Sequence, residues 1–97
     1  MHSAALSGHA GIVAILLDHG ASINGQETES GATPLYLAAY LGREDVVRLL
    51  LDRGANPNLC NKAGVSPLRA AVAAENKSIA AAIVARGGRD GCEQPRL

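Results

Sequence analysis

One sequence pattern occurs three times in this chain, and no other feature restricts its fold as strongly. Residues 33–58 read TPLYLAAYLGREDVVRLLLDRGANPN. Upstream, the segment that starts at Ala4 aligns with the one at Ala38, and downstream the segment that starts at Gly64 aligns with the one at Gly31. The offsets of 34 and 33 residues indicate a solenoid, in which each unit is too small to bury its apolar face alone and must stack on its neighbours.

The length and composition agree with a stack of short helices. At 97 residues the chain is one domain, and only 2% of its residues are aromatic, so Ala and Leu must fill the core. Faces lined with Ala let helices approach closely. The composition therefore favours short antiparallel helices over a globule built around large side chains.

The charge balance excludes some classes of partner. Nine Lys and Arg residues balance nine Asp and Glu residues, so no basic field exists to attract nucleic acid or a membrane surface. The balance is uneven along the chain, because residues 1–34 contain no Lys or Arg. A solvated surface explains this unevenness, with head-to-tail contact between molecules as the alternative.

Neither a membrane span nor a targeting segment is visible. The apolar stretch from Ile12 to Leu17 is too short to cross a bilayer, and no Lys or Arg precedes it as in a signal peptide. We therefore expect a reducing compartment, and a cytoplasmic location with the nucleus not excluded. In that compartment Cys60 and Cys92 are predicted to be free thiols, because they lack CxxC spacing and are too few for a disulfide framework.

Hydroxyl-proline pairs predict the start of one helix in each of two units. Thr33-Pro34 and Ser66-Pro67 combine a capping hydroxyl with a proline that loses no hydrogen bond at the first helical position. The helices are expected to run to about Leu41 and about Ala74. Gly42 is expected to supply the left-handed residue after the first of them.

A second helix is predicted to follow a tight turn. It opens at Glu44 and Asp45, whose carboxylates are stabilised by the positive end of the helix dipole, and it ends at Gly54. Its apolar residues from Val46 to Leu51 form a broad buried face. Because the turn is short, the two helices of each unit must run antiparallel.

These residues together resemble the ankyrin repeat. The resemblance rests on Gly31, Thr33, Pro34, Leu35, Ala38, Ala39, Gly42, Val46, Val47, Leu49, Leu50, Leu51, Gly54, Ala55 and Asn58. It implies an all-α solenoid of antiparallel helix pairs linked by β-hairpin-like finger loops, with a concave groove between the fingers and the first helices. It also implies a non-catalytic module that binds another protein.

The resemblance divides the chain into three units and a tail. The units cover residues 1–25, 26–58 and 59–88, which form a single domain over 1–88, and residues 89–97 are predicted to be a flexible tail. The first unit is truncated at its start, so its front face is open and self-association through it is an alternative. The third is degenerate: small residues such as Ala80 and Ala82 indicate a C-terminal cap.

Two further features of the sequence depart from the family pattern. The family usually has a His after Thr-Pro-Leu that bonds the adjoining turn; His2 keeps it, whereas Tyr36 and Arg69 replace it. In the third unit Glu75-Asn76 stands where the second unit has Gly42-Arg43. Of these two residues Asn76 is expected to take the left-handed conformation, because Asn tolerates it better than Glu.

No group of residues has the spacing of a catalytic or metal site. The histidines do not pair with one another at i, i+4 or lie near either Cys in the sequence. Ser3 beside His2 has no third group to orient a base. The pair Glu44 and Asp45 is already explained by the helix dipole. We therefore predict no enzyme activity, no metal and no cofactor.

The resemblance places partner contacts at the finger tips and late in each first helix. Tyr40 is singled out because an exposed Tyr gives much contact area at little entropic cost; the alternative is that it only covers the neighbouring helix. Tyr36 is expected to be structural. The predicted partner-binding residues are Leu6, Ser7, Gln26, Glu29, Ser30, Ala32, Tyr40, Leu41, Cys60, Lys62, Val65 and Ala73.

The sequence thus predicts a protein–protein interaction module that binds through its groove and fingers. One alternative is a recognition domain cut from a larger enzyme or regulatory protein. Another is a structural element that self-associates through the open front face. Nothing in the groove residues identifies the partner.

Overall fold

The computed structural model describes residues 2–92, and for Leu6 it describes the backbone only. Within this range the chain forms six helices and no strand. The helices are α1 (His2–Ser7), α2 (Ala10–Asp18), α3 (Pro34–Leu41), α4 (Glu44–Asp52), α5 (Pro67–Ala73) and α6 (Lys77–Ala85). Each predicted unit therefore contains one helix pair.

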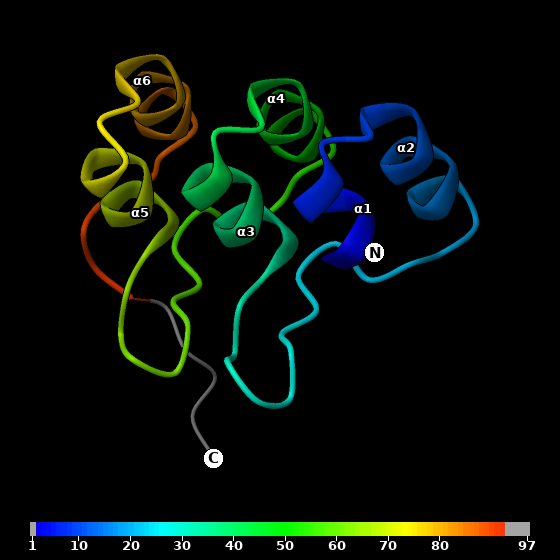
Figure 1. Cartoon of the computed structure of the whole chain (residues 1–97), viewed down its shortest axis with the longest axis horizontal. Helices are drawn as coiled ribbons and strands as arrows, with labels where there is room; N and C mark the ends of the chain where they lie inside the picture. The colour runs from blue at the N-terminus through cyan, green and yellow to red at the C-terminus, as the bar shows by residue number, and fades with distance from the viewer. Residues whose placement is uncertain (1, 93–97) are drawn as a thin grey trace.

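The helices form two parallel rows (Figure 1). The inner row consists of α1, α3 and α5, and the outer row of α2, α4 and α6. Contacts run along each row, from α1 to α3 to α5 and from α2 to α4 to α6, and across each pair. The long loops between units extend from one side of the stack, as the resemblance implies.

The predicted caps begin the inner helices. The Thr33 hydroxyl accepts a hydrogen bond from the Tyr36 amide at 3.1 Å, and the Ser66 hydroxyl accepts one from the Arg69 amide at 3.1 Å. Pro34 occupies the first helical position of α3, where its missing N–H removes no helical bond. These two sites confirm the expected starts.

The turns inside the units differ in the residue that takes a left-handed conformation. Gly42 does so with φ of 75°, as predicted. In the third unit the left-handed residue is Glu75, with φ of 58°, so the expectation for Asn76 was wrong. Asn76 instead caps α6, because its side chain accepts a hydrogen bond from the Ile79 amide at 3.1 Å. Keeping the repeat register forces the residue at the position of Gly42 into this conformation.

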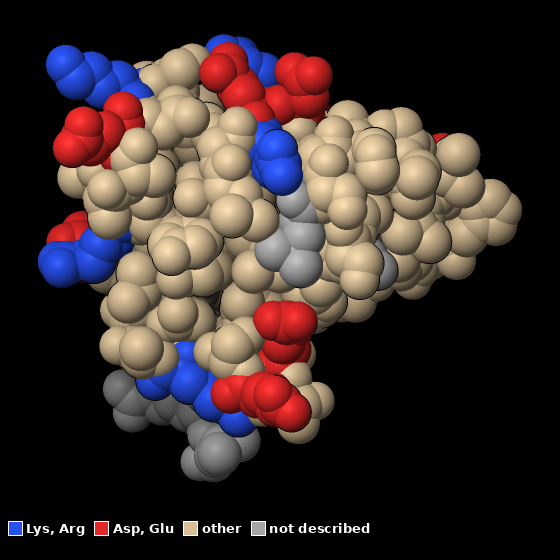
Figure 2. All heavy atoms as spheres, viewed as in Figure 1, with Lys and Arg blue, Asp and Glu red and all other residues tan. Residues whose placement is uncertain are grey.

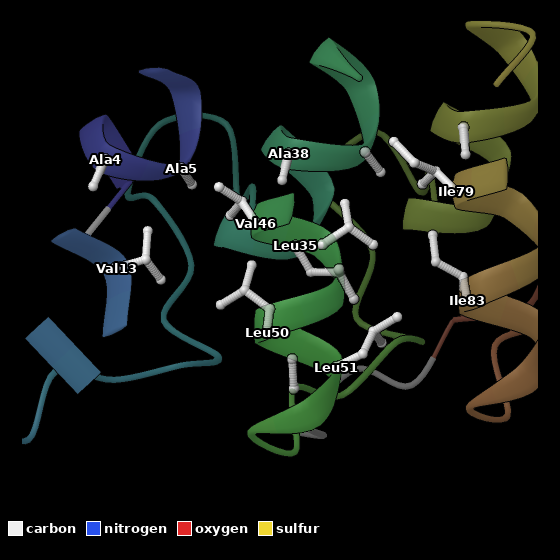
Figure 3. Packing of buried hydrophobic residues seen from close by; sticks show 14 residues of the cluster. Ala4, Ala5, Val13, Leu35, Ala38, Val46, Leu50, Leu51, Ile79 and Ile83 are labelled. Atoms are coloured by element: carbon white, nitrogen blue, oxygen red, sulfur yellow. The ribbon is translucent and has the colours of Figure 1, made fainter. Parts of the chain in front are cut away.

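The core is one continuous apolar seam between the rows (Figure 3). Leu50 and Val46 of α4 are fully buried, and so are Ile79 and Ile83 of α6. Fully burying one such side chain contributes roughly 1.5–3 kcal/mol. Because every unit contributes to its neighbour's core, the seam and not any single unit stabilises the fold.

Polar contacts repeat at the same register between units. Asp18 pairs with Arg53 at 2.8 Å, and one unit later Asp52 pairs with Arg86. The side chain of Asn24 likewise accepts a hydrogen bond from the Asn56 amide at 2.8 Å. These contacts orient each unit on the one before it, although exposed ion pairs contribute only about 0–1 kcal/mol each.

A disulfide joins Cys60 and Cys92, whose Cα atoms are 5.4 Å apart. The prediction of two free thiols was therefore wrong: stacking the third unit brings these cysteines together although 32 residues separate them. The expectation of a reducing compartment loses the support of free thiols, and a cytoplasmic location stays a prediction.

The segment after α6 is attached to the stack as far as Cys92. The Arg89 amide donates to the Asn58 side chain at 2.9 Å, and the Asp90 carboxylate pairs with Arg69 at 2.7 Å. Three residues of the predicted flexible tail, Arg89, Asp90 and Cys92, thus contact the stack. The rest of that prediction, residues 93–97, lies outside the described residues.

Candidate functional site

The structure exposes most of the residues predicted to bind a partner. Tyr40 and Leu41 lie at the C-terminal end of α3, with 57% and 40% of their surface exposed. Val65 is partly buried in the second finger loop. The other exposed members of the predicted set are Ser7, Gln26, Glu29, Ser30, Lys62 and Ala73.

Two members of the predicted set do not expose a side chain in the described part of the structure. Ala32 is 1% exposed, and Cys60 is fully buried and bonded to Cys92. Because both side chains are buried, neither is accessible to a partner in this structure. The side chain of Leu6 lies outside the described residues.

Two stacked tyrosine rings form the aromatic part of the candidate site. The Tyr36 and Tyr40 rings are nearly parallel, with an interplanar angle of 5° and centroids 6.1 Å apart. Tyr36 is half-buried and supports the exposed Tyr40 ring from one side. This contact restricts the motion of the Tyr40 ring before any partner arrives, which lowers the entropy lost on binding.

The face formed by the inner helices carries few charges. In Figure 2 the middle of this face is almost free of Lys, Arg, Asp and Glu, and charged side chains gather toward its upper, lower and left edges. Ser7, Tyr40, Leu41 and Ala73 are all exposed and uncharged. An uncharged centre with a charged rim is the arrangement of many protein interfaces.

Hydrogen bonds hold the two finger loops together. Finger 1 is defined as residues 26–32 and finger 2 as residues 59–65. The Gln26 side chain donates to the carbonyl of Gly31 at 3.0 Å and to that of Cys60 at 2.9 Å. The Lys62 amide donates to the Ser30 carbonyl at 2.9 Å. The fingers thus present a preorganised surface.

Each finger closes on itself as a hairpin-like turn. In finger 1 the Glu27 amide donates to the Ala32 carbonyl at 3.0 Å, and in finger 2 the Asn61 amide donates to the Val65 carbonyl at 3.1 Å. Gly31 has φ of 73°, and a Cβ there would lie 2.8 Å from the Lys62 backbone nitrogen. Only glycine satisfies both conditions.

A cleft of about 520 Å³ lies between the fingers. Its wall includes Thr28, Asn61 and Lys62, together with Cys60 and Cys92 of the disulfide. Sequence reasoning missed Thr28 and Cys92 as parts of this surface. The repeat register held a usable signal for Cys92, because this residue aligns with Leu59, the immediate neighbour of Cys60.

The position at which the family usually has a His after Thr-Pro-Leu carries a different side chain in each unit. His2 lies 2.8 Å from the Gly25 carbonyl through its Nε2 atom, as the family pattern implies, and Tyr36 stacks on Tyr40 instead. Arg69 braces the segment after α6 through Asp90, and its guanidinium lowers the pKa of the Asp90 carboxyl by hydrogen bonding. His2 and Arg69 thus hold a neighbouring segment, whereas the ring of Tyr36 contacts a residue of its own helix.

One other carboxyl has a perturbed pKa. The pKa of Glu44 is lowered, first by its hydrogen bonds from Arg48 and then by the one from Ser78. Ser78 lies one unit further along the chain, with its hydroxyl 3.0 Å from the Glu44 carboxylate. This carboxylate therefore stabilises the helix N-terminus and the contact between units.

Residues 2–92 contain neither the side-chain cluster of a metal site nor a membrane-spanning helix. In that range no three or more His, Cys, Asp or Glu side chains gather closely enough to hold a metal ion. Nor does any helix there have the length and hydropathy needed to cross a membrane.

Stacked helical hairpins joined by hydrogen-bonded loops define a helical-repeat solenoid. The family model for ankyrin repeats (3 copies) matches residues 1–61, which is more than half of the chain. The chain therefore belongs to the ankyrin repeat family. Ankyrin repeats are generally protein–protein interaction modules and are typically non-catalytic.

Segments of several larger proteins are similar in sequence to this chain. Neurogenic locus notch homolog protein 4 of Homo sapiens is 47% identical over 64 residues, or 66% of this chain and 3% of that protein. The 2-5A-dependent ribonuclease of Homo sapiens is 48% identical over 67 residues, or 68% of this chain and 9% of that protein. The NF-kappa-B inhibitor cactus of Drosophila melanogaster is 46% identical over 59 residues, or 61% of this chain and 12% of that protein. The chain thus spans a small part of each relative's length.

Proposed function

We propose that this chain is a non-catalytic recognition module that binds a partner protein through its inner-helix face and its two fingers. The observation that carries the proposal is the exposed Tyr40 ring, stacked on Tyr36 and next to the exposed Leu41. Large apolar side chains this exposed are costly to leave in water. Tyr is also enriched among residues that dominate binding energy.

The surroundings of Tyr40 favour an apolar segment of a partner. Helix α3, which carries Tyr40, contains no charged residue, and the exposed side chains of Glu29 and Lys62 provide charges of both signs on the fingers. The partner is therefore expected to place an apolar ridge on Tyr40 and Leu41 and polar groups against the fingers. Most of the affinity is expected to come from the apolar centre, because rim charges contribute little.

The relatives support this proposal in general terms only. The relative cactus is named as an inhibitor of NF-kappa-B. Its name thus describes an action on another molecule and not a reaction that it catalyses. The relative named as a ribonuclease leaves open that such repeats belong to an enzyme. A recognition role within a larger regulatory or enzymatic protein is compatible with the proposed groove, because the repeats themselves would still only bind.

The test compares three forms of the immobilised chain as baits in a native lysate, with bound proteins quantified by mass spectrometry. The variant Tyr40→Ala with Leu41→Ala is expected to lose a specific partner. Truncating one aromatic anchor costs about 2 kcal/mol, which corresponds to a roughly 30-fold weaker Kd.

The matched control is Arg48→Ala on the outer helix of the same unit. Its side chain is 57% exposed, so it resembles Tyr40 in exposure and in the size of the truncation. This control is expected to keep every partner. If the Tyr40 and Leu41 variant also retains every specific partner, with the melting temperature of both variants unchanged, the proposed groove is wrong.

A further inference from the structure

The repeat register identifies an apolar side chain that lacks the cover its equivalents have. Ile12 of α2 aligns with Val46 of α4 and with Ile79 of α6. Val46 and Ile79 are fully buried because each packs on the preceding unit, whereas Ile12 is 49% exposed. Together with Leu16, Ser3 and other α1 and α2 residues, Ile12 lines a hollow of about 330 Å³. We call this surface the front face.

The opposite end of the stack shows the same feature. Val72 of α5 aligns with Ala39, which is fully buried, and Val84 of α6 aligns with Leu51, which is 5% exposed. Ala39 and Leu51 belong to the seam that faces the following unit. In the third unit Val72 is 61% exposed and Val84 is 54% exposed. We call the surface formed by Val72, Ala80 and Val84 the back face.

The back face keeps most of the apolar volume of an internal seam. Ala39 and Val47 of the second unit correspond to Val72 and Ala80 of the third. The small and the large side chain have exchanged places, so the combined volume of the pair is conserved. Volume-conserving exchanges of this kind are the ones that packed interfaces tolerate best. The small residues predicted to form a C-terminal cap are present, but the exposed Val72 and Val84 side chains leave apolar surface beside the polar Glu75 and Lys77 at this end of the stack.

We propose that the front face of one molecule binds the back face of a second copy, so that molecules associate head to tail and extend the solenoid. Val72 and Val84 of one copy would occupy the positions over Ile12 and Leu16 of the next. In the chain itself the equivalent pairs, such as Leu51 with Ile83, already form the seam between units. The proposed contact thus continues an interface whose geometry the molecule repeats twice.

Charges at the two ends are compatible with this contact. A Cβ on Gly8 would meet Arg43, and one on Gly42 would meet Asn76. The left-handed turn residue of each unit therefore faces the residue that precedes the outer helix of the following unit. Across the proposed junction these two positions are Glu75 and His9. A carboxylate facing an imidazole is a favourable pair, and residues 2–25 contain no Lys or Arg that Lys77 would repel.

The geometry also specifies the kind of assembly. A head-to-tail contact uses two different surfaces, so it leaves a free face at each end and extends into open chains unless the rotation closes a ring. A contact between two front faces would instead stop at a dimer. The two arrangements therefore differ in how blocking one face affects association.

The experiment blocks one face at a time with a charge that association would have to bury. Ile12→Glu blocks the front face and Val72→Glu blocks the back face, and both positions are exposed, so folding is expected to be unaffected. Molar mass is measured by sedimentation and light scattering over a hundredfold range of concentration. We expect the unsubstituted chain to grow in mass with concentration, and each variant alone to stay monomeric.

Mixing the two variants gives the decisive result. Each retains one intact face, so an equimolar mixture is expected to form a dimer with twice the monomer mass and to stop there. Ala81→Glu, an exposed position on α6, is the matched control and is expected to associate like the unsubstituted chain. Association of Val72→Glu with itself would indicate front-to-front pairing and overturn the proposal. A mixture that stays monomeric, with melting temperatures unchanged, would overturn it as well.

Discussion

The disulfide between Cys60 and Cys92 is expected to stabilise the third unit more than any other single contact. The cross-link closes a loop across 32 residues, and this loop contains both α5 and α6. In the chain-entropy account, closing a loop of this length removes about 12 cal/mol/K from the unfolded chain, which is about 4 kcal/mol at 25 °C. The exposed ion pair of Arg69 with Asp90 adds little by comparison.

The substitution Cys92→Ser removes the cross-link with little other change, because Cys92 is exposed whereas Cys60 is fully buried. A loss of 1 kcal/mol lowers the melting temperature by roughly 4–8 °C in a domain of this size. We therefore expect Cys92→Ser to melt about 15 °C or more below the oxidised chain. The melt is followed by circular dichroism, with and without a dithiol reductant.

Hydrogen exchange locates the effect. Amides of α5 and α6 are expected to exchange up to about 1,000-fold faster in Cys92→Ser, since 1.4 kcal/mol corresponds to a tenfold change, and amides of α3 and α4 are expected to change less. Reductant is expected to reproduce both changes in the unsubstituted chain and to leave Cys92→Ser unaffected. Equal melting temperatures and equal amide exchange rates for Cys92→Ser and the unsubstituted chain, both without reductant, would refute the reasoning.

Two further predictions concern single residues of the third unit. Glu75→Gly is expected to raise the free energy of unfolding by about 1 kcal/mol, because a left-handed conformation costs roughly 1–2 kcal/mol in a non-glycine residue and φ of Glu75 is 58°; chemical denaturation measures this, and an unchanged midpoint would contradict it. The lowered pKa of Asp90 means that its contribution to stability is fully present above the ordinary carboxyl pKa of about 3.9 and is lost as the pH falls through the lowered value. Arg69→Gln is expected to raise the Asp90 pKa toward its ordinary value in a carbon-13 NMR titration, whereas Arg48→Gln, which shifts Glu44 instead, is expected to leave it unchanged.

Most of the fold followed from the repeat register. Thr33 and Ser66 cap the inner helices and Gly42 takes the left-handed conformation as expected, because these are local effects between residues close in sequence. Glu75 was missed because intrinsic preference favoured Asn76, whereas the stacked neighbours determine which position must turn. A tertiary constraint thus overrode a local preference.

The candidate site was less predictable than the fold. Exposure of Tyr40 followed from its position in the repeat, but Ala32 and Cys60 are buried by tertiary packing, which the repeat position alone does not specify. The disulfide was missed because pairing requires proximity in space, and neither cysteine has a motif. Aligning Cys92 with Leu59 would have placed it beside Cys60, so the register contained information that residue spacing alone did not.

The polar residues that orient one unit on the next are missing at the back face, and for this reason association between molecules is expected to be reversible. Asp18 and Asp52 each pair with an Arg of the following unit, but the equivalent position in the third unit is Ala85. The side chains of Asn24 and Asn58 accept backbone hydrogen bonds from the following segment, and the next equivalent is a glycine. A further unit on the back face would thus meet apolar surface without these orienting bonds. Apolar contact is non-directional and proportional to area, so such a junction holds molecules together more weakly than the internal seams and dissociates on dilution.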